Sequence, residues 1–204
     1  MNPRGKDSAV CGDTGDAALD LLYPLSEFYE ESGQSLPVVQ RVDPSAMPDP
    51  YRRLLVHDSD MTPTLEAAYS ESIHLRVLHH SIRDNVFSRQ VLLVLDGDET
   101  AVEFGAIKIH LDRFPEEARR LILERRKPLG TILHQEGIEH SSRPTAYFQV
   151  TSDAAIGEAL GVGAGQALYG RQNGIFDARG EVLAQVVEIL PPLDPFAHRE
   201  KERG

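Results

Sequence analysis

The chain has 204 residues, 41% of them hydrophobic, and a formal net charge of -11 at pH 7. It is long enough for one buried core and does not require a second domain. The acidic charge argues against a nucleic-acid partner, because phosphates are bound by clustered lysines and arginines. One cysteine excludes an internal disulfide, and the absence of an apolar leader or of a run of about 20 apolar residues predicts a cytoplasmic protein without a membrane span.

The N-terminal part of the chain has helical character. Residues 1–15 and 197–204 are polar without apolar periodicity, so we expect a disordered arm and tail around one domain at 16–196. In "DAALDLLYPLSEFYEESG" the apolar spacing is helical, although the proline must interrupt or restart the helix. A short helix is expected around Tyr51 and Leu55. The stretch "DSDMTPTLEAAY" predicts another helix, with Thr62 as its N-cap and Pro63 at its first position.

Strand-like segments follow. "SIHLRVLHHSI", "VFSRQVLLVL" and "AVEFGAIKI" predict an antiparallel meander, and the letters "DGD" mark its second turn. Further helices are predicted in "PEEARRLILERR" and "TSDAAIGEALGV", and a short element in "KPLGTILHQEG". The stretch "QALYGRQNGIFDARGEVLAQVVEILPP" predicts a hairpin that turns at "ARG". Strands interrupted by helices without a regular βαβ rhythm indicate an α+β fold with an antiparallel sheet.

Two charged residues fall on apolar faces of these predicted strands. Counting by twos, Arg89 is in line with Val91 and Leu93, and Glu188 is in line with Val186. In one explanation the two charges pair across the sheet or reach water at strand ends. In the other they line a pocket, in which Arg89 binds a carboxylate and Glu188 accepts a hydroxyl proton. Such a pocket would suit a small aromatic or cyclic acid.

Eight histidines raise the question of a metal site. His79 and His80 are adjacent and therefore face opposite ways on a strand, whereas His134 and His140 flank a glycine and share no helical turn. No metal-ligand spacing results, so we predict no metal site. A site assembled from distant histidines stays open, because sequence spacing does not reveal it.

Four stretches in this order resemble the chorismate lyase family, and more closely its actinobacterial and archaeal-type branch. They are "LLVHDSDMTPTLE", similar to the family's entrance motif; "FSRQVLLVLDG", similar to its arginine-containing strand; "KPLGTIL", similar to its Pro-Leu-Gly segment; and "LYGRQNGIFDARGEVLAQVVEILPP", similar to its terminal glutamate strand. Each motif is weak alone, but their common order makes the resemblance more specific. It extends from about Leu54 to Pro192.

The resemblance implies an enzyme that removes pyruvate from chorismate to leave 4-hydroxybenzoate. In that family helical flaps enclose the ligand against the sheet, and no cofactor is used. The family's roles fall on Arg89 for the ring carboxylate, assisted by backbone amides near Met61 and Leu129, and on Glu188 for the ring 4-hydroxyl. Arg89 and Glu188 are thus the candidate catalytic residues.

A second cation should be needed, because chorismate carries two carboxylates. Arg171 and Arg76 are both candidates for it, and the residues do not decide between them. The oligomeric state is equally undetermined by the sequence.

Departures from the family keep two other functions open. Where many relatives continue the third strand of the meander with a different pattern, this chain has "VEFGAIKIH", which places Glu103, Lys108 and His110 nearby. An enzyme of a specialised-metabolite pathway acting on another cyclic or aromatic acid is one alternative. The other is a non-catalytic aromatic-acid binding module, because the same fold serves as the effector-binding domain of bacterial transcription regulators. We expect no helix-turn-helix domain, since the segment before the fold is short and acidic.

Overall fold

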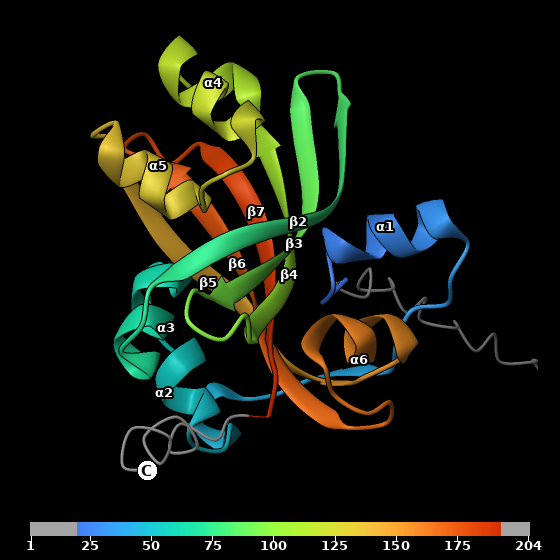
Figure 1. The fold of residues 1–204 in the computed structure, drawn as a ribbon. Helices are drawn as coiled ribbons and strands as arrows, with labels where there is room; N and C mark the ends of the chain where they lie inside the picture. Colours follow the sequence, from blue (N-terminus) through green and yellow to red (C-terminus); the bar gives the residue numbers. More distant parts are fainter. Residues whose placement is uncertain (1–19, 193–204) are drawn as a thin grey trace, which may run out of the picture.

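The computed structural model describes residues 20–192, so the predicted arm and tail lie outside the described residues. Seven strands form one antiparallel sheet in the order β1-β5-β6-β7-β4-β3-β2 (Figure 1). Together with six helices they make a single α+β domain, as predicted. The strands are β1 (Val39–Arg41), β2 (Ile73–Arg83), β3 (Val86–Leu95), β4 (Ala101–His110), β5 (His140–Thr151), β6 (Ala167–Asp177) and β7 (Val182–Leu190).

The predicted meander β2-β3-β4 and the predicted hairpin β6-β7 are both confirmed. The meander joins the hairpin where β4 pairs with β7, so the two predicted units form the centre of one sheet. Strands β1 and β5 were not predicted. β5 contains Pro144, which lies at a register irregularity, where a missing backbone N–H is tolerated.

The helices are α1 (Leu25–Ser32), α2 (Tyr51–Leu55), α3 (Met61–Tyr69), α4 (Glu116–Glu124), α5 (Leu129–Gln135) and α6 (Ala154–Leu160). Helix α1 starts directly after Pro24 and ends at Gly33, whose φ of 68° is left-handed. The predicted N-cap of α3 is wrong, because the helix begins at Met61 and Asp60 is its N-cap. No helix in the described range is long and apolar enough to cross a membrane.

The helices cover both faces of the sheet (Figure 1). Helices α1 and α6 pack on one face, in a cluster with Leu92, Phe104 and Val187. On the other face α4 and α5 form one apolar cluster with the sheet, and α2 and α3 form another. The face with two separate clusters is the one that carries the charged residues singled out from the sequence.

Candidate functional site: a pocket with a buried arginine

A cavity of about 70 Å³ lies on this face of the sheet, where α3 and α5 begin. The first residues of both helices line it, which corresponds to the predicted helical flaps. The sheet contributes side chains that alternate along five strands, as their period of two requires. The lining residues are Asp60, Met61, Thr62, Leu75, Arg89, Val91, Leu93, Glu103, Ile107, Pro128, Leu129, Gly130, Asn173, Ile175, Val186 and Glu188.

Arg89 is the cation of this pocket and is almost fully buried, with 1% of its surface exposed. Its Nη2 donates a hydrogen bond to the Lys127 carbonyl at 3.2 Å, while its Nε and Nη1 have no partner among the described residues. Burial lowers the pKa of Arg89 to about 10, so the guanidinium is still charged at neutral pH. A buried charge without a counter-ion is strongly unfavourable. The arrangement therefore favours an anion in the pocket.

Unpartnered polar atoms are concentrated in this one cavity. Of five such buried side-chain atoms in the described residues, four belong to the pocket: two on Arg89, Oε2 of Glu103 and Oδ1 of Asn173. Most buried polar atoms in proteins have a hydrogen-bond partner. A polar ligand that accepts from the arginine and also meets the carboxyl and amide would satisfy all four.

Glu103 lines the pocket, but it was not predicted as a site residue; from the sequence it was noted only as a departure from the family pattern. It is 5% exposed, and burial followed by the nearby charge of Glu188 raises its pKa well above the ordinary value, against a smaller opposite effect of Arg171. Burial therefore favours the neutral acid form of Glu103, whose O–H can donate a hydrogen bond to a ligand. Lys108, another departure, pairs with Glu27 of α1 at 2.6 Å, on the opposite side of the sheet.

Protonation of Glu103 makes the stability of the protein depend on pH. Its pKa is higher in the folded state than the value of 4.5 expected for an exposed glutamate. Its contribution to stability is therefore fully present below pH 4.5 and is lost as the pH rises towards the folded pKa. We expect Glu103→Gln to flatten the fall in the free energy of unfolding above pH 4.5, measured by urea denaturation at several pH values. An identical pH profile in the variant would contradict a raised pKa of Glu103.

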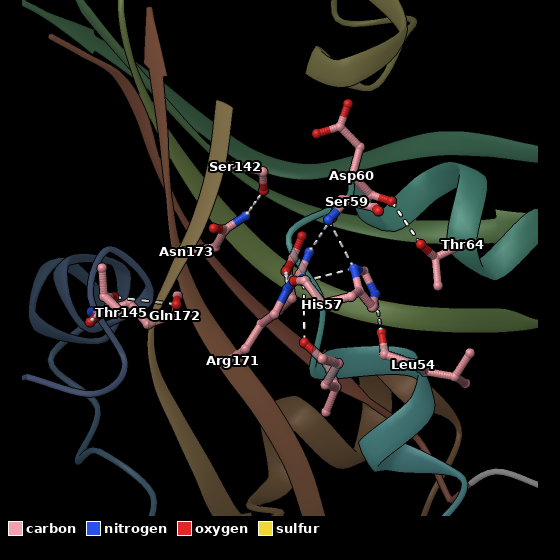
Figure 2. Close-up of polar contacts among 12 residues, drawn as sticks. Leu54, His57, Ser59, Asp60, Thr64, Ser142, Thr145, Arg171, Gln172 and Asn173 are labelled. Atoms are coloured by element: carbon pink, nitrogen blue, oxygen red, sulfur yellow. Dashed lines mark hydrogen bonds and ion pairs between the residues drawn. The ribbon is translucent and has the colours of Figure 1, made fainter. Parts of the chain in front are cut away.

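Glu188 lines the pocket, but its counter-ion is Arg171 and not Arg89. Arg171 is 0% exposed, and its Nε donates to the Glu188 carboxylate. Its Nη1 donates to the carbonyls of Leu55 at 3.2 Å and His57 at 2.9 Å, and its Nη2 to that of Ser59 at 3.2 Å. Figure 2 shows the guanidinium reaching into this loop, which leads to α3. Arg171 thus fixes Glu188 and the loop, and it does not line the pocket.

Of the other predicted site residues, two line the pocket and one does not. Met61 and Leu129 are the first residues of α3 and α5 and lie in the pocket with Arg89 and Glu188. Arg76 is exposed on β2, where it forms an ion pair with Glu99, and it does not line the pocket. The structure therefore places neither candidate for a second cation in the pocket lining.

The histidines do not all lie apart as their spacing indicated. His134 and His140 both approach the carboxylate of Asp60, with their Nε2 atoms 3.3 Å and 3.2 Å from its Oδ2. The ligating atoms of these three residues lie within 4.8 Å of one another. The sequence left open a site assembled from distant histidines, and these two histidines do lie together; that no metal is bound stays a prediction.

No protein-family model and no curated protein matches the chain. Among solved structures it is similar to PhnF from Mycobacterium smegmatis, with 16% identity, a TM-score of 0.53, and coverage of 67% of this chain and 65% of that chain. The isolated effector domain of PhnF gives 15% identity, a TM-score of 0.50 and coverage of 65% and 88%. A GntR-family transcriptional regulator from Bacillus cereus is also matched, with 9% identity, a TM-score of 0.42 and coverage of 59% and 92%.

The match spans just under two thirds of full-length PhnF but most of its effector domain. At these identities the similarity concerns the fold alone. The chain therefore has the fold of the PhnF effector domain, consistent with the chorismate lyase-like fold to which its motifs pointed.

Proposed function

We propose that this protein binds a small aromatic carboxylic acid of the hydroxybenzoate type without transforming it. The observation that carries the proposal is the buried Arg89, whose Nε and Nη1 donors have no partner among the described residues. A planar carboxylate matches the fork of a guanidinium and would neutralise its charge. The ring would then lie among the apolar side chains of the sheet, such as Val91 and Ile107.

The part of the pocket near Glu188 suits a hydroxyl group on the ring of the ligand. In the sheet register Arg89 of β3 lies opposite Ile107 of β4, and Glu188 of β7 lies opposite Gly105 of β4. Arg89 and Glu188 are therefore separated by two strand spacings across the sheet and by two residues along it. Strand spacing then separates their Cα atoms by about 12 Å, which leaves room for one ring between the side chains. A hydroxyl there can donate to the Glu188 carboxylate and accept from the acid form of Glu103, which burial favours.

Two observations favour a monocarboxylate over chorismate. Among the described residues Arg89 is the one cation that lines the pocket, because Arg171 is engaged with Glu188 and the loop. The cavity of about 70 Å³ is also far smaller than the roughly 300–1,000 Å³ of pockets for drug-sized ligands. A single-ring acid fits this charge and size better than a diacid with an additional enolpyruvyl group. The similarity to an effector domain supports the same reading.

Chorismate lysis is the second candidate, because Glu188 shares the pocket with Arg89, as the family resemblance implies. In that reaction a base removes the C4 proton, the C3–O bond breaks, and the released enolpyruvate is protonated to pyruvate. The ring becomes aromatic, which drives the elimination. A positioned base such as Glu188 contributes on the order of 10²- to 10⁴-fold.

One experiment separates the two candidates. Purified protein is incubated with chorismate while pyruvate and hydroxybenzoate are followed by mass spectrometry, and binding of 2-, 3- and 4-hydroxybenzoate is measured by calorimetry. We expect saturable binding of a hydroxybenzoate and no pyruvate above the buffer control. Pyruvate release that Glu188→Gln abolishes would establish the lyase instead. Absence of binding to all three acids would contradict the proposed function.

A further inference from the structure

A cluster of one aspartate and two histidines lies beside the pocket and has no role in the proposed function. We propose that Asp60, His134 and His140 form a binding site for a divalent transition-metal ion of the zinc class. Two imidazoles and one carboxylate are ligands that such ions accept. Their ligating atoms already lie within 4.8 Å of one another in the described structure.

The fold brings these residues together from three elements. Asp60 caps α3, His134 lies in the last turn of α5, and His140 is the first residue of β5. The chain reverses between the two histidines at Gly137, whose φ is 63°. The reversal is closed by a hydrogen bond from the Ile138 amide to the Leu133 carbonyl at 2.8 Å.

A hydrogen bond at Nδ1 of His140 orients the ring so that its second nitrogen, Nε2, faces Asp60. Nδ1 of His140 lies 3.0 Å from the Ile138 carbonyl, which accepts only, so Nδ1 carries the proton. Nε2 faces the Asp60 carboxylate at 3.2 Å, on the side where the metal ion would be bound. A carbonyl that holds the outer N–H of a ligating histidine is the usual arrangement at metal sites.

The distances fit a metal ion. Zinc lies about 2.1 Å from nitrogen and oxygen ligands, so two ligands of a tetrahedral ion are about 3.4 Å apart. The two nitrogen-to-oxygen distances to Asp60 are 3.2 Å and 3.3 Å. Figure 2 shows the Asp60 side chain directed away from the Arg171 cluster, so the carboxylate is free of that network.

Room remains for a further ligand. A cavity of about 670 Å³ flanks the cluster and is lined by all three residues together with Asp58, Ser59 and Arg143. Water can therefore complete the coordination. Because Asp60 also lines the acid pocket, the ion would connect α3, α5 and β5 at the edge of that pocket. The metal site does not depend on the proposed function.

The test uses the full chain in a Cys11→Ser background without an affinity tag, so that no thiol or tag histidines contribute. After EDTA treatment and removal of the chelator, Zn²⁺ binding is measured by calorimetry and Co²⁺ binding by visible absorption. We expect one equivalent of metal per chain. His134→Ala should weaken binding at least about tenfold, and it should fold normally because the side chain is 68% exposed. His79→Ala, at an exposed position on β2, is the matched control and should bind as wild type.

Two results would overturn the proposal. One is the absence of saturable Zn²⁺ and Co²⁺ binding. The other is equal affinity in wild type and His134→Ala. If His134→Ala lowers the melting temperature while neither protein binds metal, the cluster is only a set of His–Asp ion pairs.

Discussion

Replacing Arg89 with methionine is expected to abolish binding of 4-hydroxybenzoate while leaving the protein at least as stable as wild type. Arg89 is buried, charged and without a counter-ion among the described residues, so an apolar side chain of similar length suits the ligand-free fold better. The carboxylate loses charge-assisted hydrogen bonds worth about 1.5–3 kcal/mol each, which predicts a loss of affinity of at least about 100-fold. Calorimetry and urea denaturation measure the two quantities.

The matched control for this variant is Arg76→Met. Arg76 is also an arginine of the β2-β3 pair, but its side chain is 45% exposed and it does not line the pocket. We expect wild-type affinity in the control. Retained affinity in Arg89→Met, or a fall in its stability of more than about 2 kcal/mol, would mean that Arg89 has a structural role.

The largest loss of stability is expected from Arg171→Met. This change leaves Glu188 buried beside Glu103 without a cation and removes the donor to the carbonyls of Leu55, His57 and Ser59. Breaking a buried ion pair by removing one partner costs about 3–5 kcal/mol. Urea denaturation should show a decrease of that size in the free energy of unfolding.

A double variant tests the physical reason for this loss. Arg171→Met combined with Glu188→Gln removes the stranded charge, so it should be more stable than Arg171→Met alone. A single Arg171→Met variant that loses less than about 1 kcal/mol would contradict the ion pair as a major contribution. Arg76→Met again serves as the control, because exposed ion pairs contribute little.

Local patterns predicted the parts of the fold that depend on neighbouring residues. The alternation around Arg89 and Glu188 placed both on apolar strand faces, and these faces line the pocket. The turn letters placed the meander and the hairpin. Strand β5 was missed because Pro144 and the polar run before it hide its alternation. The N-cap of α3 was misplaced by two residues, because Thr62 and Asp60 are both good caps by type.

The partners of the site residues could not be predicted, because they depend on contacts between distant segments. Arg171 and Leu55 are 116 positions apart, and only the folded loop shows that the arginine is already engaged. The convergence of His134 and His140 on Asp60 depends on a chain reversal and on a helix start far earlier in the sequence. The raised pKa of Glu103 likewise follows from its burial and from the nearby charge of Glu188.

The central claim is that Arg89 binds a carboxylate in this pocket, and a comparison of two ligands with two proteins tests it most directly. Calorimetry with 4-hydroxybenzoate and with 4-hydroxybenzamide, which has the same shape without the charge, is carried out on wild type and Arg89→Met. Wild type is predicted to prefer the acid by at least about tenfold, the worth of one charge-assisted hydrogen bond, and the variant is predicted to lose that preference. Equal affinity of wild type for the acid and the amide, or an unchanged preference in Arg89→Met, would contradict the account.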